Sequence, residues 1–339
     1  MNIVMVGCGR QGRLHLQCLA KLQDSFDVRI VGVVDASPDR AAAVVRSLPA
    51  LGFAAEGVVQ GDSLAMLAGE VDLREAVVDV VTTNTAHHEV AIQAAAGGAR
   101  GIVIEKPLAD TLEHAHRLRD LERPVYMMEN YVFSVVTDFV REYLAANRLT
   151  PRFVKTEFSK DRRRDSRDGR GMLDDYVPHV FDVEMPHQIA LVAHLLGPAR
   201  AVYDAWCHDM VLPDGRITDH GEGAITLAHD GGVTSYNYSN LLGYHCLSQT
   251  HRTVRLYCDD DVRILCYYPS TVDLSGSVLV YRGGRMVERR SFFDDSLTEA
   301  FRQLLTCCRD DVAAVTDAQF GCAVLDVLTT GKRLARDHR

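Results

Sequence analysis

Several kinds of residue are scarce in this chain of 339 residues, and each scarcity excludes a class of protein. Its nine cysteines include no C-x-x-C pair, and their odd number fits neither a complete disulfide framework nor a zinc knuckle. No apolar run approaches the roughly 20 residues that a membrane span requires. The formal net charge of -9 argues against a nucleic-acid-binding surface. Only five lysines accompany 32 arginines, so a lysine inside a motif attracts notice.

The rest of the composition is that of an ordinary globular protein of the size of many enzymes. Apolar residues make up 47% of the chain and charged residues 24%, which allows a large core, and the length favours two domains over one. The first residues lead directly into a predicted strand and a glycine turn, with no charged segment ahead of a long apolar stretch. We therefore expect a cytoplasmic protein that contacts neither membrane nor nucleic acid.

The first 128 residues alternate between strand patterns and helical patterns. Continuous runs of valine and isoleucine are typical of strands buried on both faces of a parallel sheet. Such runs lie at Ile3–Val6, Val28–Val34, Val77–Val81, Ile102–Ile104 and Val125–Met127, and helical patterns lie between them at Leu14–Leu22, Ala41–Leu48, Glu89–Ala96 and Leu112–Leu121. The series predicts an α/β protein in which residues 1–128 form a Rossmann domain with a doubly wound parallel sheet.

The pattern changes from about Arg152. Alternating strand-like segments lie around 200–210, 222–240, 252–267 and 277–292, and amphipathic stretches near Ala190–Leu196 and 298–335 flank them. We predict that residues 129–339 form an α+β domain with a large, mostly antiparallel sheet. An alternative for the last helix is that it packs back on the Rossmann domain.

A glycine motif follows the first predicted strand and precedes a helix. Gly7, Gly9 and Gly12 form the pattern G-x-G-x-x-G, with Arg10 and Gln11 inside it. Gly7 would permit the tight turn, Gly9 would let the backbone approach a pyrophosphate, and Gly12 would let helix and strand pack closely. The helix N-terminus offers amide hydrogens to the phosphates. In this context the motif predicts a dinucleotide site rather than a purely structural turn.

Asp35 ends the second predicted strand and is placed to select the cofactor. Its carboxylate can accept hydrogen bonds from the ribose hydroxyls of adenosine and would repel a 2′-phosphate, so NAD is favoured over NADP. The alternative is that Asp35 caps the helix beginning near Pro38, although Ser37 is the more natural cap.

Two further motifs follow later strands and complete a family pattern. Residues 82–87 read TTNTAH and precede a helix, and residues 105–107 read EKP after the fifth strand. The order of glycine turn, acid after the second strand, T-x-N-x-x-H and E-K-P resembles the Gfo/Idh/MocA family, the glucose–fructose oxidoreductase and inositol dehydrogenase group. The likeness covers essentially the whole chain, and E-K-P in this position is its most specific mark.

The resemblance implies an NAD-dependent dehydrogenase acting on a secondary alcohol of a sugar, cyclitol or aminoglycoside-type substrate, or on the corresponding ketone. It implies Lys106 as a catalytic residue. An ammonium beside the nicotinamide can hydrogen-bond the reacting hydroxyl and stabilise alkoxide character as hydride leaves. Glu105 would orient Lys106, and the Lys106–Pro107 bond is expected to be cis, as it often is in this family.

The resemblance also implies cofactor contacts and an assembly. Thr83, Asn84 and His87 fall in the turn on the cofactor side, where Asn84 would contact nicotinamide or ribose. The alternative for His87 is a packing residue at the start of a helix. The second domain would bind the polyhydroxylated substrate and form a homodimer or homotetramer.

The family's third mark, D-x-x-x-H on a helix, is where the chain departs from the pattern. Asp175 and His179 match the upstream part, whereas His187 has the usual spacing to the helix-ending Gly197. About eight extra residues separate the two matches. Histidine suits proton transfer because its ordinary pKa lies near working pH.

Two arrangements of these histidines stay open. Eight residues are close to two helical turns, so His179 and His187 could share one helix face with Asp182 near both. Pro186 opposes this, because proline inside a helix removes a hydrogen bond and kinks it, and the helix would then begin at Pro186. We place the pair of Asp175 and His179 first and the pair of Asp182 and His187 second.

Other interpretations have less support. A metal site built from Asp175, His179, Asp182, Glu184 and His187 lacks a third-ligand spacing typical of zinc. Competing functions are an oxidoreductase of the same fold acting on an imine or dihydrodiol, and a regulatory protein that senses NAD or a ligand without turnover.

Overall fold

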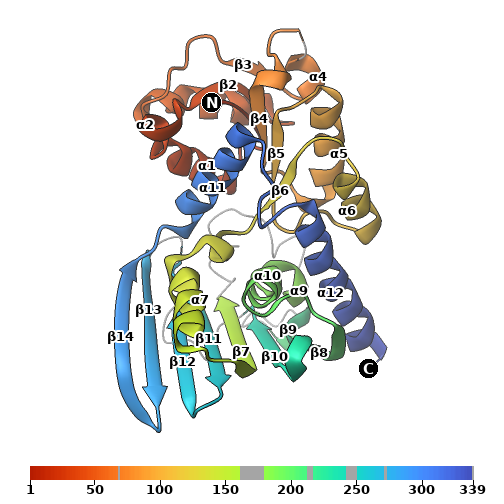
Figure 1. The fold of residues 1–339 in the computed structure, drawn as a ribbon. Coiled ribbons are helices and arrows are strands. Elements are labelled where there is room, and N and C mark those ends of the chain that lie inside the picture. The colour runs from red at the N-terminus through yellow and green to blue at the C-terminus, as the bar shows by residue number, and fades with distance from the viewer. Residues whose placement is uncertain (68, 161–178, 212–216, 242–249, 271–272, 338–339) are drawn as a thin grey trace. The chain divides into compact units, whose positions relative to one another are not determined.

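The structure is a computed structural model that describes residues 1–67, 69–160, 179–211, 217–241, 250–270 and 273–337. The chain divides into two compact units, each built from two segments (Figure 1). The first unit is Met1–Asn130 with Leu297–Leu325, and the second is Tyr131–Ser296 with Asp326–Arg339. The first unit therefore contains a segment that follows the whole second sheet in sequence.

A parallel sheet of six strands in the order β3-β2-β1-β4-β5-β6 forms the centre of the first unit. Its strands are β1 (Asn2–Val6), β2 (Arg29–Val34), β3 (Val59–Gly61), β4 (Ala76–Val80), β5 (Gly101–Glu105) and β6 (Val125–Met128). This strand order reverses direction between β1 and β4, and such reversal points are where doubly wound sheets bind ligands at their carboxyl ends. The predicted α/β class and parallel sheet are confirmed.

Helices connect these strands. They are α1 (Arg10–Ala20), α2 (Gln23–Phe26), α3 (Pro38–Ser47), α4 (Leu64–Leu67), α5 (Asn84–Ala96) and α6 (Leu112–Arg119), and α11 (Ser296–Asp310) joins the same unit from Leu297 onward. Helix α3 begins at Pro38, whose fixed φ suits the first helical position. The long helix α12 (Ala318–Asp337) begins in the first unit and ends in the second.

The second unit contains a sheet of eight strands in the order β14-β13-β12-β11-β7-β10-β9-β8. They are β7 (Pro151–Lys160), β8 (Ala201–Val211), β9 (Ile217–Ala228), β10 (Thr234–Asn240), β11 (Thr250–Cys258), β12 (Val262–Tyr267), β13 (Ser275–Arg282) and β14 (Arg285–Phe293). Among the described strands of this second sheet, only β7 and β10 pair in parallel, so the predicted mostly antiparallel sheet is confirmed.

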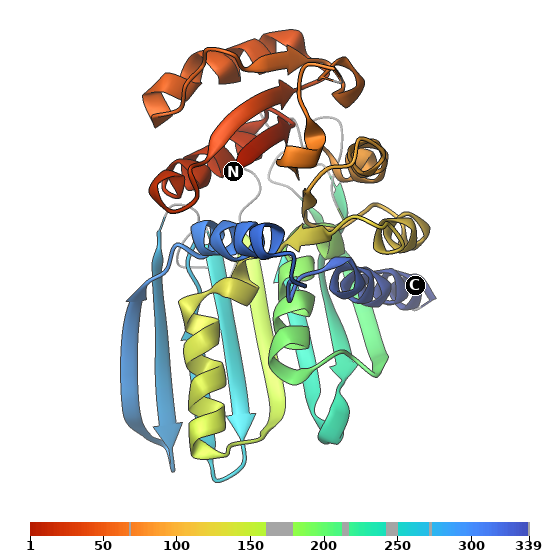
Figure 2. The ribbon, with the colours of Figure 1, turned by 45° about the horizontal axis from the view of Figure 1, so that its top comes forward.

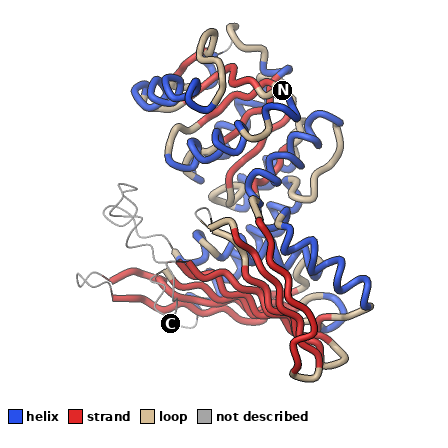
Figure 3. Tube along the Cα trace, turned by 90° about the vertical axis from the view of Figure 1, so that its left-hand side faces the viewer, coloured by secondary structure: helices blue, strands red, loops and turns tan. Residues whose placement is uncertain are grey.

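Helices cover one face of this sheet, as Figure 3 shows. Helix α7 (Val135–Asn147) packs on β12 and β13, and α10 (Met185–Leu196) packs on β7 and β10. In Figure 2 these are the yellow and light green helices lying along the sheet. The short helix α9 (Val180–Val183) precedes α10. The covered face is apolar because alternate strand residues such as Val154, Phe158 and Val254 are fully buried.

The structure corrects several sequence-based boundaries. Each of the three segments predicted around 222–240, 252–267 and 277–292 is a pair of antiparallel strands, and 298–335 is two helices, with Asp311 at positive φ after the first. Strand β7 and helix α7 were not predicted. The interpretation that His179 and His187 share one helix face is wrong, because α9 ends at Val183 and α10 begins at Met185. None of the described helices has both the length and the apolar character needed to cross a bilayer.

Candidate cofactor and catalytic site

The glycine turn between β1 and α1 has the geometry that its sequence predicts. Gly7 has a φ of 109°, a backbone conformation that favours glycine, and its amide donates to the Val34 carbonyl at 2.8 Å. A Cβ on Gly7 would lie 2.4 Å from the carbonyl oxygen of Val81. The turn is thereby held between the ends of β2 and β4.

Gly12 and Gly9 meet different surroundings. A Cβ on Gly12 would lie 2.2 Å from the Gly7 carbonyl oxygen, so close packing of helix and turn needs glycine there. A Cβ on Gly9, at the N-cap of α1, would meet no protein atom within 4 Å. Space therefore lies beside the N-terminus of an 11-residue helix, where backbone amides and the helix dipole favour an anion. These residues fit the pyrophosphate of a dinucleotide.

Asp35 lies directly beside this turn. Its Oδ2 accepts a hydrogen bond from the Cys8 amide at 2.8 Å, and its Oδ1 accepts one from the Ser37 amide at 2.9 Å. Asp35 thus helps to fix the two turns beside it, but it does not cap α3, because the N-cap is Ser37 and no side-chain cap bond is made there. A carboxylate has about four acceptor positions, so capacity remains for two ribose hydroxyls.

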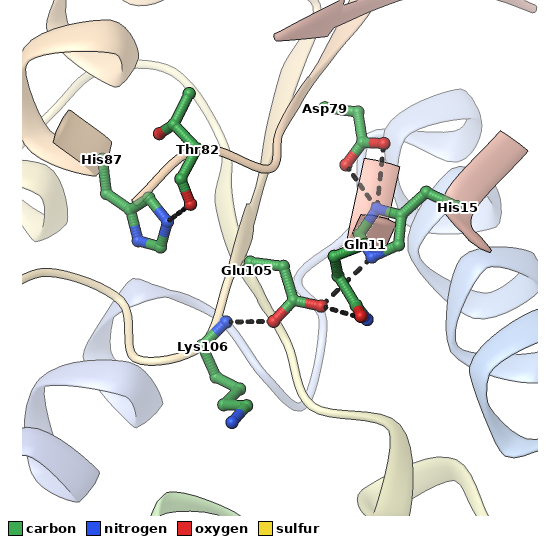
Figure 4. A network of polar contacts seen from close by, with 7 residues as sticks. All are labelled: Gln11, His15, Asp79, Thr82, His87, Glu105 and Lys106. Carbon is green, nitrogen blue, oxygen red and sulfur yellow. Dashed lines mark hydrogen bonds and ion pairs between the residues drawn. The ribbon is translucent and has the colours of Figure 1, made fainter. Parts of the chain in front are cut away.

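The E-K-P turn leaves the end of β5, and its Lys106–Pro107 bond is cis, as expected. Glu105 accepts a hydrogen bond from the Lys106 amide through Oε2 at 3.0 Å. Figure 4 shows the Lys106 side chain pointing away from this carboxylate. The amino group of Lys106 is therefore separate from the carboxylate that fixes its main chain.

His87 supports the same turn from helix α5. Its ring is 1% exposed, with Nδ1 2.9 Å from the Pro107 carbonyl and Nε2 3.3 Å from the Thr82 carbonyl. Burial lowers the pKa of His87 below its ordinary value of 6.5, so the ring is neutral at pH 7. Its single N–H is best placed to donate to Pro107. This geometry matches the packing alternative for His87 more closely than a direct cofactor contact.

The remaining predicted cofactor residues lie at the starts of helices. Thr83 is the exposed N-cap of α5, with its hydroxyl 3.1 Å from that of Thr85, and Asn84 is the first residue of the helix. Arg10 is exposed at the first position of α1. Within the first unit, the glycine turn, Asp35, Asn84 and Lys106 all follow the carboxyl ends of parallel strands, and these ends meet at one edge of the sheet.

A buried cluster of charged side chains lies beneath these turns (Figure 4). His15 of α1 is 0% exposed, and its Nδ1 lies 3.0 and 3.1 Å from the two carboxylate oxygens of Asp79. Its Nε2 lies 3.1 Å from Glu105 Oε1, which also accepts a hydrogen bond from Gln11 Nε2 at 3.1 Å. The cluster joins α1, β4 and β5.

The charge state of His15 follows from these partners. Burial by itself would lower its pKa, but attraction to Asp79 and hydrogen bonds to Asp79 and Glu105 outweigh burial and raise the pKa to about 10. Ionised carboxylates only accept hydrogen bonds, so both ring nitrogens must carry protons. His15 is accordingly an imidazolium between two acids at neutral pH.

Sequence reasoning missed His15 and Asp79. A usable signal was present, since Asp79 interrupts an otherwise apolar strand and a buried charge requires a partner. Gln11 and His15 are four residues apart on one helix face. Asp79 pairs with Val103, two residues before Glu105, so Asp79 and Glu105 share a sheet face.

In the second unit, His179 is the N-cap of α9. Its Nδ1 accepts a hydrogen bond from the Phe181 amide at 3.1 Å, which places the proton of a neutral ring on Nε2. Nε2 lies 3.9 Å from Cys207 Sγ, and the ring stacks on His220 with centroids 4.4 Å apart. A neutral His179 in this arrangement has no ring lone pair left to take a proton.

His187 lies in the first turn of α10, in different surroundings. Its ring meets the ring of Tyr131 edge-on, with centroids 5.1 Å apart. The guanidinium of Arg252 lies 5.5 Å from the centre of the same tyrosine ring and is ion-paired with Glu184 at 3.3 Å. Both members of that pair are buried, and Tyr131 donates its hydroxyl hydrogen to the Pro269 carbonyl. His187 thus packs against Tyr131, whose ring is in turn contacted by the ion-paired Arg252.

The carboxylates predicted to assist the histidines are placed differently. Asp182 forms an ion pair with Lys332 of α12, and Asp175 lies outside the described residues. Glu184 is bound to Arg252, so the two described carboxylates of the disfavoured metal site, Asp182 and Glu184, both have other partners. Across the described parts of the chain, His, Cys, Asp and Glu side chains form no group of three or more that could hold a metal ion.

Comparisons with known proteins agree with the fold. Residues 1–126 match the Gfo/Idh/MocA model, described as an oxidoreductase family with an NAD-binding Rossmann fold. A sequence search of curated proteins finds no match for the chain.

Solved structures resemble the chain over nearly its full length. UDP-N-acetylglucosamine 3-dehydrogenase GnnA from Acidithiobacillus ferrooxidans is 19% identical, with a TM-score of 0.76 over 99% of this chain and 98% of that one. Levoglucosan dehydrogenase, solved with NADH and levoglucosan, is 17% identical, with a TM-score of 0.78 over 100% and 98%. KijD10, a 3-ketoreductase from Actinomadura kijaniata solved with NADP, is 14% identical, with a TM-score of 0.78 over 98% and 97%.

At these identities the structural likeness shows the fold, and the family match rests on the segment that carries the glycine turn, Asp35 and the E-K-P turn. Residues 1–126 match the NAD-binding domain of the Gfo/Idh/MocA oxidoreductase family, which confirms the resemblance drawn from the motifs of this segment.

Proposed function

We propose that the protein is an NAD-dependent dehydrogenase that oxidises a secondary alcohol of a sugar, cyclitol or aminoglycoside-type substrate, or reduces the corresponding ketone. The observation that carries this proposal is the position of Lys106 directly after β5, at the sheet edge where the glycine turn also lies. Two of the similar structures have sugar-type names or ligands, UDP-N-acetylglucosamine and levoglucosan, which supports this substrate class.

The first unit supplies the cofactor site in this proposal. Gly7, Gly9 and Gly12, with the amides of Arg10 and Gln11, hold the pyrophosphate at the N-terminus of α1. Asp35 accepts hydrogen bonds from the adenosine ribose, and its charge disfavours a 2′-phosphate, so NAD is preferred to NADP. Thr83 and Asn84 bind on the nicotinamide side. When bound, the cofactor supplies the hydride acceptor.

Lys106 and a histidine of the second unit act on the substrate hydroxyl. The Lys106 ammonium hydrogen-bonds the reacting oxygen and stabilises the negative charge that develops on it. We assign the proton-accepting role to His187 rather than His179, because the cap bond to Phe181 occupies Nδ1 of His179. The helix of His187 also ends just before Gly197, the spacing that the family pattern requires.

The second unit also provides the assembly surface that the resemblance implies. The face of the eight-stranded sheet opposite its helices exposes aromatic rings, among them Phe153, Tyr257 and Tyr267, which are 37 to 40% exposed. Phe153 and Tyr257 are cross-strand partners with ring centroids 5.8 Å apart. We propose that a second copy of the chain covers this face in a homodimer or homotetramer of a cytoplasmic enzyme.

The test combines cofactor binding with turnover. NAD and NADP are titrated by fluorescence, and the absorbance of reduced nicotinamide is followed against cyclitols, sugars and aminoglycosides. The Lys106→Ala and His187→Ala variants should lose at least 100-fold in kcat, and His179→Ala should keep most of it. Cofactor binding without turnover on any member of the panel would refute the dehydrogenase and favour a ligand-sensing protein.

A further inference from the structure

His15 itself has no part in the proposed reaction, yet the buried cluster around it touches both functional turns of the first unit. His15 and Gln11 belong to α1, the helix that begins at the glycine turn. Glu105 belongs to the E-K-P turn and binds the Lys106 amide at 3.0 Å. One carboxylate therefore links the phosphate-binding helix to the main chain of the proposed catalytic lysine.

His15 is fully buried, and it contacts three other elements of the first unit. Asp79 from β4 faces Nδ1, and Glu105 from β5 faces Nε2. The ring of Phe301 from α11 packs edge-on at 4.8 Å. Asp79 and Glu105 are the titratable groups in contact with the ring, and both are acids, so they hold the imidazolium in one orientation.

The same contacts fix Glu105. Its Oε1 accepts hydrogen bonds from His15 and from Gln11, and its Oε2 accepts one from the Lys106 amide. These three donors lie in different directions, so together they hold the Glu105 carboxylate in one orientation. Loss of His15 removes a charged donor from Glu105, and charge-assisted hydrogen bonds are roughly twice as strong as neutral ones.

We propose that His15, held as a cation between Asp79 and Glu105, is a positioning residue for Lys106. It fixes the Glu105 carboxylate, and Glu105 fixes the Lys106 main chain relative to the helix at the glycine turn. This role deepens the proposed function and rests on it for its catalytic meaning. The physical linkage itself concerns only residues of the first unit.

The variants are chosen so that the protein keeps its fold. His15→Gln alone leaves Asp79 buried without its cation, so it is made beside the double variant His15→Gln with Asp79→Asn, which removes that orphaned charge. The matched control is His114→Gln. His114 also pairs with one carboxylate, Asp110, at 2.7 Å, but it lies partly exposed on α6.

The first measurement does not depend on a substrate. The chain has five lysines, so reductive methylation with ¹³C-formaldehyde gives five dimethyl-lysine NMR signals, and the loss of one signal in Lys106→Arg assigns Lys106. We expect the Lys106 signal to move or split in His15→Gln and in the double variant, with the other four signals unmoved. All five should stay in place in His114→Gln.

The second measurement compares the effect of the His15 variants on kcat with their effect on the Kd for NADH. A displaced catalytic group costs turnover rather than affinity, so kcat should fall about 10- to 100-fold, while the Kd for NADH changes less than threefold. A general loss of structure would instead weaken NADH binding and move several lysine signals together.

The outcomes separate the two proposals. A folded double variant with the wild-type Lys106 signal and kcat overturns the positioning role and leaves the dehydrogenase standing. A general loss of structure in both His15 variants, with several signals displaced, also overturns it. If the wild-type protein shows no turnover on the panel, the dehydrogenase fails, and the Lys106 signal still decides whether His15 positions this lysine.

Discussion

The buried imidazolium makes a quantitative prediction about protons. In the folded protein the pKa of His15 is about 10, because Asp79 and Glu105 outweigh burial, whereas its ordinary value is 6.5. Between these two values the folded state holds about one proton more than the unfolded chain. The free energy of unfolding should therefore fall with rising pH by about 1.4 kcal/mol per pH unit in this range.

The sign follows from the direction of the shift. Because the folded pKa of His15 is raised, its stabilising contribution is complete below pH 6.5 and is lost as pH rises through about 10. At pH 8 to 8.5, unfolding in urea should release about one more proton from the wild type than from a variant without this histidine. A pH-stat counts this proton directly and does not require the two units to unfold together.

The comparison variant is again the double change His15→Gln with Asp79→Asn. His15→Gln alone is unsuitable, because it leaves the buried carboxylate of Asp79 without its cationic partner and so changes two groups at once. Cysteines and the amino terminus exchange protons to the same extent in both proteins, so their contributions cancel. Equal proton release from both proteins would show that His15 is neutral when folded, and the charge assigned to the cluster would be wrong.

Three further predictions concern the two units. Gly12→Ala should destabilise the protein strongly, because its Cβ would lie 2.2 Å from a carbonyl oxygen. Gly9→Ala should leave the melting temperature nearly unchanged, because its Cβ would meet no protein atom within 4 Å. The same Gly9→Ala change should weaken NADH binding in a fluorescence titration. Asp35→Asn should raise the ratio of kcat/KM for NADP to that for NAD at least tenfold, since the charge that repels a 2′-phosphate is gone; an unchanged ratio would refute that role. Glu184→Gln should lower the free energy of unfolding by about 3–5 kcal/mol, because it removes the carboxylate that is ion-paired with the buried Arg252; urea unfolding followed by the fluorescence of the single tryptophan measures the loss. A loss below 1 kcal/mol would contradict it.

The parallel sheet was predictable from sequence because its strands are buried on both faces and therefore read as unbroken valine and isoleucine runs. Strand β7 was missed because its half-buried positions carry charges such as Lys155 and Glu157, and it begins at a proline. The predicted strand segments merged hairpins, since turns such as Asp259–Asp261 interrupt the apolar alternation only briefly.

The candidate site was predictable where a local motif encodes it. The glycine turn, Asp35 and the E-K-P turn each depend on a few consecutive residues, and the structure places all of them at strand ends. The His15 cluster joins residues 64 and 90 positions apart, and it is visible only once β4 and β5 are known to be neighbours on the α1 side. The choice between His179 and His187 depended on a cap hydrogen bond that spacing alone does not reveal.

Helix α11, which reaches the first unit only after the second sheet has been passed, has a consequence for biosynthesis. Its Phe301 packs against the His15 ring, and the carbonyls of Cys308 and Arg309 accept hydrogen bonds from Arg100. At ordinary rates of translation, roughly 10 to 30 seconds separate the emergence of residue 130 from that of α11. During that interval the nascent Rossmann segment lacks the Phe301 ring that packs against His15. The first unit can therefore complete its folding only when nearly the whole polypeptide has left the ribosome.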